Sequence, residues 1–274
     1  FNSVAQFERF GPMALLRGIS CGLRINPQYS PVETDLYNPC VPGSRLGVTA
    51  DLLKELPAGI DGLHFHVLCE SRPHHLRLAL EAVEKHFGQY LDRIKWLNMG
   101  GGHLMTHAEY DCDELIALLR EFKARHPHLR LILEPGSAFT WRTGYLVSTI
   151  EDLVENAGVH TAMLDVSFAC HMPDCLEMPY KPAIVGAHEP AEGEKRWRMG
   201  GTSCLAGDYY GDWAFDHELK VGERIVFEDM IHYTMVKTTM FNGVAHPAIV
   251  IARRDGRIDV VREFGYEDFR NRMS

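Results

Sequence analysis

The feature that most constrains the fold is an alternation of short apolar runs with amphipathic helical stretches, which continues from the start of the chain to about Gly136. In the helical stretches, apolar residues recur three and four positions apart, so one face of each helix is apolar. Repeated units of strand and helix predict a parallel sheet, because parallel strands are joined by crossover connections that usually contain a helix. The expected strands are residues 1–3, 21–26, 62–67, 95–100 and 129–136, and the apolar helix positions are Leu76, Leu80, Val83, Phe87, Leu115, Leu118, Leu119 and Phe122.

These five units are fewer than the eight of a (β/α)8 barrel, a fold that typically takes about 250 residues. The first residues, Phe1 to Ser3, resemble the end of a strand. We therefore expect residues 1–142 to form an incomplete (β/α)8 barrel, with the N-terminal strands missing because the chain begins part way through the barrel.

The second half of the chain has a different pattern. After about Thr143, turn residues separate short β-like runs, and few helical patterns intervene. We expect residues 143–274 to form a mainly β C-terminal domain, so the predicted fold class is α/β followed by β. The β-like runs are residues 145–150, 161–168, 223–230, 232–236 and 247–261.

Composition narrows the possible functions. The 274 residues are 46% hydrophobic and 24% charged, which is ordinary for a globular protein, and the formal net charge is −9. Because no long cluster of Lys and Arg is present, nucleic acid is an unlikely partner, and no apolar run is long enough to span a membrane. Seven cysteines without a CxxC pair or a signal-peptide pattern favour a reducing, cytoplasmic compartment.

Polar and glycine residues follow the predicted strands. Arg24, His66, the run Gly100–Gly102 and Glu134 would lie at the carboxyl ends of barrel strands, which is where barrel enzymes carry their active sites. Singly, each has a simpler explanation. Arg24 could form a salt bridge at the barrel rim, and His66 could be a core imidazole. The glycine run could be a common turn, and Glu134 could be a surface acid. Together, a glycine backbone that suits a phosphate, an acid and an imidazole predict a site for pyridoxal phosphate.

The motifs LRIN, GLHFHV, LNMGGGH, LEPGS, LDVSFACHMPDC, GGTSCLAGD and FEDMIHYTMVKTTMFNG occur in this order along nearly the whole chain. In these motifs the chain resembles the pyridoxal-phosphate decarboxylases of the alanine-racemase fold (fold type III), the group that includes ornithine and diaminopimelate decarboxylases. Within that group, LCES, HMPDCLEMPYKP and especially CLAGD are similar to the carboxynorspermidine/carboxyspermidine decarboxylases. The resemblance implies a lyase of polyamine (spermidine) biosynthesis, acting on a carboxylated polyamine and releasing carbon dioxide.

The resemblance also implies how the cofactor is bound. His66 would stack on the ring of pyridoxal 5'-phosphate, and Gly100, Gly101 and Gly102 would hold its phosphate. Glu134 would face the pyridine nitrogen and keep it protonated, so that the ring can accept the electrons left by departing carbon dioxide. Tyr233 would add a hydroxyl to the phosphate; otherwise it is a core aromatic. Arg24 would lie near the cofactor or anchor Glu134.

The same resemblance places the active site at the interface of a homodimer. Cys204 would reach into the partner's barrel and return a proton to the α-carbon of the substrate, while Asp174 and Asp208 would bind the distal amino group. Glu177 and Glu70 are further candidates for that amine, although Glu177 is equally well explained as a solvated acid. No metal site is expected.

Two departures from the related enzymes bear on the substrate. Ser137 stands where ornithine-type enzymes have an arginine, and Leu205 stands where the group has an acid; both changes favour a substrate longer than a short diamino acid. The family's Schiff-base lysine belongs to the first barrel strand, and we expect it upstream, because none of the eight lysines here matches its context. The alternatives are a diaminopimelate or ornithine decarboxylase, a racemase on the same fold, and a non-catalytic regulatory homologue.

Overall fold

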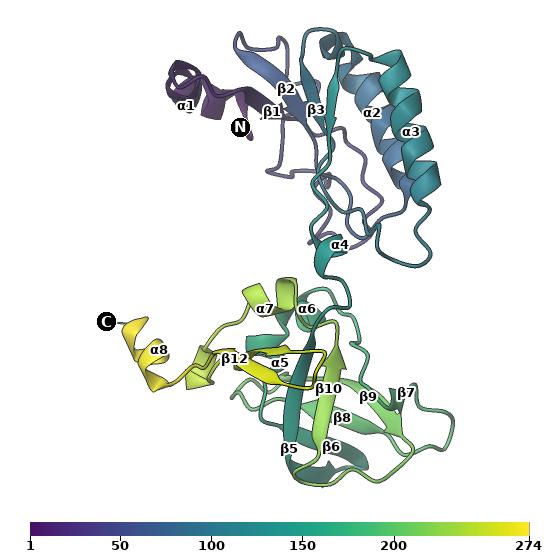
Figure 1. Cartoon of the computed structure of the whole chain (residues 1–274), viewed down its shortest axis with the longest axis vertical. Coiled ribbons are helices and arrows are strands. Elements are labelled where there is room, and N and C mark those ends of the chain that lie inside the picture. Colours follow the sequence, from purple (N-terminus) through teal and green to yellow (C-terminus); the bar gives the residue numbers. More distant parts are fainter. Residues whose placement is uncertain (274) are drawn as a thin grey trace. The chain divides into compact units, whose positions relative to one another are not determined.

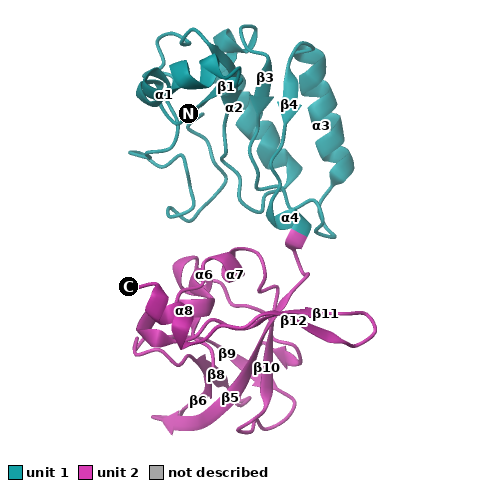
Figure 2. Ribbon diagram, turned by 60° about the vertical axis from the view of Figure 1, so that its left-hand side comes forward, with its two compact units in different colours: residues 1–139 teal, residues 140–274 magenta. Residues whose placement is uncertain are grey.

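The computed structural model describes residues 1–273 and divides into two compact units, Phe1–Phe139 and Thr140–Ser274 (Figure 2). Each unit has its own hydrophobic core. The expected domain boundary, between residues 142 and 143, lies just beyond this division, after a short helix at Ser137–Thr140.

Unit 1 is built on a four-stranded parallel sheet in the order β1-β2-β3-β4 (Figure 1). A row of leucines crosses the sheet in register, with Leu23 beside Leu63, Leu63 beside Leu97 and Leu97 beside Leu131. Because the first three are fully buried, this row fixes which faces of the strands point into the core. The elements of unit 1 are α1 (Val4–Leu16), β1 (Cys21–Arg24), β2 (Ile60–His64), α2 (Pro73–Leu91), β3 (Trp96–Asn98), α3 (Cys112–Arg125), β4 (Arg130–Ile132) and α4 (Ser137–Thr140).

Helices α2 and α3 lie side by side along the sheet (Figure 1). Their predicted apolar positions are confirmed, since all of them are buried or packed against the core. Helix α2 has Pro73 in its first turn, where a missing N–H costs nothing. Helix α3 begins after Asp111, whose side chain accepts a hydrogen bond from the N–H of Glu114 at 2.8 Å.

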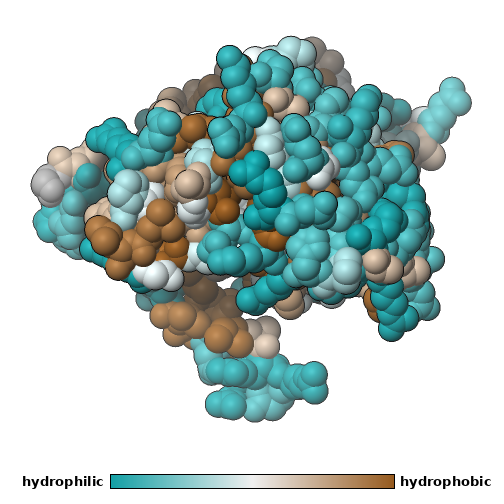
Figure 3. Space-filling model, turned by 90° about the horizontal axis from the view of Figure 1, so that it is seen from above, coloured by the Kyte–Doolittle hydropathy of each residue, from teal (hydrophilic) through white to brown (hydrophobic). Residues whose placement is uncertain are grey.

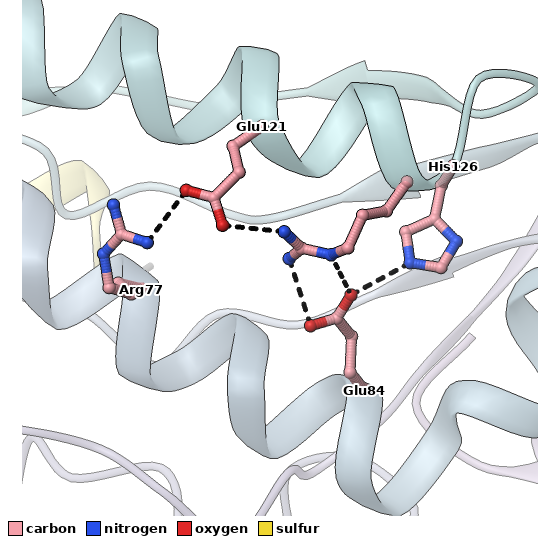
Figure 4. Close-up of polar contacts among 5 residues, drawn as sticks. Arg77, Glu84, Glu121 and His126 are labelled. Carbon is pink, nitrogen blue, oxygen red and sulfur yellow. Dashed lines mark hydrogen bonds and ion pairs between the residues drawn. The ribbon is translucent and has the colours of Figure 1, made fainter.

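Charged side chains join the outer faces of these two helices (Figure 4). Glu84 of α2 contacts both Arg125 and His126 at 3.0 Å, and Arg125 continues the network to Glu121 at 2.8 Å. Glu121 in turn contacts Arg77 of α2 at 3.0 Å. Because most of these side chains are partly exposed, we expect the network to contribute little to the free energy of unfolding.

The segments around β1 differ from the sequence prediction. Residues 1–3 are not a strand, yet Phe1 makes strand-like contacts: its amino group donates to the carbonyl of Gly22, and its carbonyl accepts from the N–H of Arg24, both at 2.8 Å. The connection from β1 to β2, residues 25–59, contains no α-helix. It is held to the sheet by Val48, which exchanges backbone hydrogen bonds with Arg24 and Asn26.

Helix α1 leaves apolar side chains exposed. It starts at Ser3, whose Oγ accepts from the N–H of Gln6 at 3.1 Å, and it buries Phe7 in the core. Seen from above, exposed apolar side chains gather on the left of Figure 3, the side on which α1 is drawn in Figure 1. The exposed apolar residues in and just after α1 are Phe10, Met13, Leu15, Leu16 and Ile19.

Unit 2 is a six-stranded sheet in the order β10-β5-β6-β8-β9-β7, with short helices and a separate two-stranded hairpin (Figure 1). All the strand pairs of the larger sheet are antiparallel except β6 with β8. Phe168 and Phe227 are fully buried and meet edge to face in its core, with ring centroids 5.8 Å apart. The elements are β5 (Tyr145–Asn156), β6 (Val159–Leu164), α5 (Phe168–His171), α6 (Pro173–Glu177), β7 (Ala187–His188), β8 (Trp197–Gly200), β9 (Tyr209–Phe215), β10 (Arg224–Glu228), α7 (Tyr233–Val236), the 3-10 helix η1 (Phe241–Gly243), β11 (Ile249–Ala252), β12 (Ile258–Arg262) and α8 (Tyr266–Asn271).

Two sequence predictions in unit 2 are wrong. Residues 232–236 were expected as a strand but form the single helical turn α7, closed by a hydrogen bond from the N–H of Lys237 to the carbonyl of Tyr233. The expected run 161–168 ends early, because Ser167 caps α5 by accepting the N–H of Cys170 at 3.0 Å. Strands β8 and β9, which the sequence reading missed, lie between β6 and the edge strand β7.

Within residues 1–273, no helix is long and apolar enough to cross a membrane. The seven cysteines are all free. The same residues contain no group of His, Cys, Asp and Glu side chains that could hold a metal ion.

Candidate functional site

The carboxyl ends of β1 to β4 lie together at one edge of the parallel sheet. Backbone pairing continues past the strands: the N–H of Phe65 donates to the carbonyl of Asn98, and the N–H of Glu134 donates to the carbonyl of Gly100 at 2.8 Å. These hydrogen bonds hold the residues that follow each strand next to those of its neighbour. The structure therefore brings together the predicted residues of unit 1, which are Arg24, His66, Gly100, Gly101, Gly102 and Glu134.

The three glycines are required by the packing of the backbone itself. A Cβ on Gly100 would lie 2.5 Å from the carbonyl oxygen of Phe65, one on Gly101 would lie 2.4 Å from that of Glu134, and one on Gly102 would lie 2.2 Å from that of Leu68. Gly102 also has a φ of +89°, which side chains with a Cβ rarely adopt. The loop is therefore bare backbone, and it can approach a ligand closely.

Two N–H groups of this glycine loop, residues 100–102, are held by side chains at the strand ends. The N–H of Gly100 donates to Oδ1 of Asn98 at 2.9 Å, and the N–H of Gly101 donates to Nδ1 of His66 at 2.9 Å. Burial lowers the pKa of His66, with a smaller contribution from Arg24. The imidazole is therefore neutral near pH 7, as its role of acceptor requires.

Glu134 is the acid of this site, and its side chain is 53% exposed. Its Oε1 accepts a hydrogen bond from Nδ2 of Asn98 at 2.6 Å, and its Oε2 lies 3.8 Å from Nε2 of His64. Burial lowers the pKa of His64 to about 4, so this imidazole is neutral near pH 7. The carboxylate thus has an amide donor on one oxygen and a neutral ring near the other.

Asn98 and His64 were not among the predicted site residues. Both could have been found from strand periodicity, since His64 precedes His66 by two positions and Asn98 precedes Gly100 by two. Arg24, which was predicted, donates from its guanidinium to the carbonyl oxygen of His66 at 3.4 Å. This contact joins the ends of β1 and β2.

A second histidine follows the glycine loop. His103 is 2% exposed, and its Nδ1 lies 3.1 Å from the hydroxyl of Tyr110. Its Nε2 is buried without a hydrogen-bond partner among residues 1–273. Burial lowers the pKa of His103 to about 4, so the ring is neutral in the folded protein.

The predicted residues of unit 2 form two groups. In the first, Lys237 contacts the carboxylates of both Asp174 and Glu177, the latter at 2.6 Å. Tyr233 lies at the start of α7, four positions before Lys237, and its side chain is largely exposed. The two predicted substrate acids therefore both contact the same lysine.

The second group is the loop of residues 201–208. Cys204 is exposed on it, whereas Asp208 at its end is 4% exposed. The Asp208 carboxylate accepts two backbone hydrogen bonds, from the N–H of Ala169 at 2.9 Å and from the N–H of Ser203 at 3.0 Å. This position favours a role for Asp208 in shaping the Cys204 loop rather than in contacting a substrate.

Comparison with known proteins gives a consistent result. A family model described as "Pyridoxal-dependent decarboxylase, C-terminal sheet domain" matches residues 29–231. A carboxyaminopropylagmatine decarboxylase from Synechocystis is 59% identical over 274 residues, covering 100% of this chain and 71% of the relative. A carboxynorspermidine/carboxyspermidine decarboxylase from Campylobacter jejuni is 40% identical over 281 residues, covering 98% of this chain and 72% of the relative.

Solved structures agree with these relatives. The crystal structure of a carboxynorspermidine decarboxylase complexed with norspermidine, from Campylobacter jejuni, has a TM-score of 0.86 at 38% identity and covers 99% of this chain and 74% of its own. A diaminopimelate decarboxylase from Helicobacter pylori, complexed with L-lysine, has a TM-score of 0.78 at 20% identity, covering 98% of this chain and 71% of its own, and bears on the fold alone. The predicted fold class, α/β barrel strands followed by a β domain, is confirmed.

Proposed function

Because the chain belongs to the family of pyridoxal-dependent decarboxylases, we propose that it removes the carboxyl group of a carboxylated polyamine, carboxynorspermidine or carboxyspermidine, giving norspermidine or spermidine and carbon dioxide. The observation that carries the proposal is the match along nearly the whole chain to enzymes named for these substrates. The sequence identity is 40% to one such relative and 38% to one of known structure. The predicted family, the decarboxylase class and the dependence on pyridoxal phosphate agree with the matches.

The residues at the strand ends fit this cofactor. The glycine loop has no room for a Cβ and presents bare backbone, which suits a phosphate group. Glu134 is an exposed carboxylate with a fixed amide donor behind it, which suits a protonated ring nitrogen. When bound, pyridoxal phosphate supplies an electron sink for the bond that breaks as carbon dioxide leaves.

Each residue then has a task that its own chemistry supports. Glu134 holds the proton of the pyridine nitrogen in place, His66 offers a neutral flat ring, and the glycine loop binds the phosphate. Arg24 braces the end of β1 against His66, and the role of Tyr233 at the phosphate stays a prediction.

We assign binding of the polyamine to acidic side chains of unit 2. Asp174 and Glu177 both contact Lys237, and we assign to these two carboxylates the binding of a cationic group of the substrate. Asp208 supports this site indirectly, because its buried carboxylate organises the loop that carries Cys204. Cys204, an exposed thiol, would return the proton to the α-carbon across a homodimer interface in the cytoplasm.

A second substrate is favoured by one specific observation. The Synechocystis relative named carboxyaminopropylagmatine decarboxylase is 59% identical over 100% of this chain, against 40% for the carboxynorspermidine/carboxyspermidine enzyme. Such a substrate ends in a guanidinium group, and carboxylates are its natural partners because they accept its paired N–H donors. The acid pair Asp174 and Glu177 is compatible with either ending.

The experiment is a comparison of substrates with the full-length protein. Carbon dioxide release is measured with carboxyaminopropylagmatine, carboxynorspermidine, carboxyspermidine, ornithine and diaminopimelate in the presence of pyridoxal phosphate. We expect the three carboxylated polyamines to have kcat/KM values at least about a hundredfold above the two amino acids, a difference of about 2.7 kcal/mol. Among the three, we expect the guanidinium-ended substrate to have the highest kcat/KM. Faster turnover of ornithine or diaminopimelate would overturn the proposal.

A substitution tests the acid pair directly. Asp174→Asn removes a charge that the proposal assigns to substrate binding, so KM for the carboxylated polyamine should rise about tenfold or more with a smaller change in kcat. Glu192→Gln, in an exposed segment of the same unit, is the matched control and should leave both constants unchanged. An unchanged KM in the Asp174 variant would remove this residue from the binding site.

A further inference from the structure

Asn98 connects the two parts of the cofactor site. It is the last residue of β3, directly before the glycine loop, and it is half-buried. Its Oδ1 accepts the N–H of Gly100 at 2.9 Å, and its Nδ2 donates to Oε1 of Glu134 at 2.6 Å. One side-chain amide therefore contacts both the loop assigned to the phosphate and the carboxylate assigned to the ring nitrogen.

The two contacts determine each other's direction. A backbone N–H needs an acceptor, so the oxygen of the Asn98 amide must face Gly100, and the NH2 group must then face Glu134. Because the NH2 group can only donate, the facing oxygen of Glu134 must be an acceptor. A donor in this place holds the carboxylate of Glu134 in one orientation.

The other groups around Glu134 do not duplicate this contact. His64, from the end of β2, is neutral near pH 7 and lies 3.8 Å from the other carboxylate oxygen, beyond hydrogen-bond distance. Arg24, from the end of β1, donates to the carbonyl of His66, and the neutral ring of His66 accepts the N–H of Gly101. Within residues 1–273, Asn98 thus provides the hydrogen bond that orients the Glu134 carboxylate.

We propose that Asn98 is a positioning residue that holds the Glu134 carboxylate and the glycine loop in one fixed arrangement. In this arrangement the ring nitrogen and the phosphate of the cofactor can be bound at the same time. The inference deepens the proposed function, since it rests on the assignment of these two groups to pyridoxal phosphate. It predicts that the identity of the amide matters, and that an isosteric acid is a poor replacement.

The informative substitution is Asn98→Asp. It keeps an oxygen for the N–H of Gly100 but places a second carboxylate against Glu134, where two acids must share a proton or repel each other. Asn98→Asp with Glu134→Gln reverses the pair, because the glutamine then donates to the aspartate. The double variant removes the repulsion while also removing the acid that faces the ring nitrogen.

Asn38 offers a matched control. It makes the same kind of turn, accepting the N–H of Cys40 at 2.8 Å, and its Nδ2 donates to the carbonyl of Val32 at 2.9 Å. The hydrogen-bond partner of its NH2 group is therefore a backbone carbonyl and not a carboxylate. Asn38→Asp changes charge and hydrogen bonding in a similar turn without creating that pair.

The first measurement uses the full-length protein without cofactor. Denaturant midpoints are compared at pH 6 and pH 8.5 for the wild type, Asn98→Asp, Asn38→Asp and the double variant. We expect the midpoint of Asn98→Asp to fall as pH rises, because the shared proton is lost, and to recover in the double variant. If the midpoint of Asn98→Asp equalled that of Asn38→Asp at both pH values, the inferred interaction between Asn98 and Glu134 would be wrong.

The second measurement is the affinity for pyridoxal phosphate, followed by absorbance on titration. We expect Asn98→Asp to bind at least about tenfold more weakly at pH 8.5 than the wild type, with partial recovery at pH 6, and Asn38→Asp to bind normally. Equal affinity of Asn98→Asp and wild type at pH 8.5 would overturn the positioning role. Neither measurement uses a polyamine, so failure of the proposed substrates is distinguishable from failure of this inference.

Discussion

Replacing Asp208 should unfold the region around the Cys204 loop at lower denaturant concentration. Its carboxylate is 4% exposed and satisfies two backbone N–H groups, those of Ala169 and Ser203. The same side chain fills the space beside Gly201, where a Cβ would lie 2.4 Å from a carboxylate oxygen. The residue therefore ties the start of α5 to the loop.

The magnitude follows from these two hydrogen bonds. A hydrogen bond to a charged group contributes about 1.5–3 kcal/mol, and a buried donor left without a partner costs about 1–3 kcal/mol. Asp208→Asn keeps one acceptor but turns an NH2 group toward the other N–H, so it should cost about 1.5–3 kcal/mol. Asp208→Ala loses both acceptors and should cost roughly twice as much.

The assay is equilibrium unfolding in urea, followed by the fluorescence of the tryptophans. Asp216→Asn is the matched control, because that side chain is 95% exposed and should change the free energy of unfolding by less than about 0.5 kcal/mol. If Asp208→Asn were as stable as this control, the two backbone hydrogen bonds would not organise the loop, and the reasoning would be wrong.

Three further predictions concern pH, the glycine loop and the thiol. His103 and His171 are buried, and burial lowers the pKa of each to about 4. Their neutral rings therefore contribute their full stabilisation above about pH 6.5, and this contribution should fall as pH drops toward 4, because in this range only the unfolded chain takes up protons. Urea midpoints measured across this range check the sign. Gly102→Ala should lose more thermal stability than Gly193→Ala, since both have positive φ but only the Cβ of the first meets backbone; equal losses would contradict the packing argument. Cys204→Ala in the full-length protein should lower turnover at unchanged cofactor affinity, and an unchanged rate would exclude the thiol from proton return.

Much of unit 1 could be predicted because strong periodic signals coincide there. The helix positions three and four apart are buried in α2 and α3, and the leucines of successive strands stand in register. Once the strands are parallel, their carboxyl ends meet at one edge. The gathering of His66, Gly100 and Glu134 therefore followed from strand order alone.

The contacts within the site could not be predicted in the same way. Asn98 and Glu134 are 36 positions apart, and Lys237 lies 63 positions from Asp174, so their pairing depends on tertiary packing that periodicity does not report. Likewise, the single turn α7 is too short for a helical period to be distinguished from alternation. The buried position of Asp208 has no signal in its glycine-rich surroundings.

The bond between Nδ1 of His66 and the N–H of Gly101 has a consequence for acid sensitivity. Since Nδ1 is the acceptor, the ring proton resides on Nε2, and a second proton could bind only by displacing the amide of Gly101. Protonation of Nδ1 would therefore break the hydrogen bond that joins the end of β2 to the glycine loop. This link between two neighbouring strand ends therefore requires a neutral imidazole.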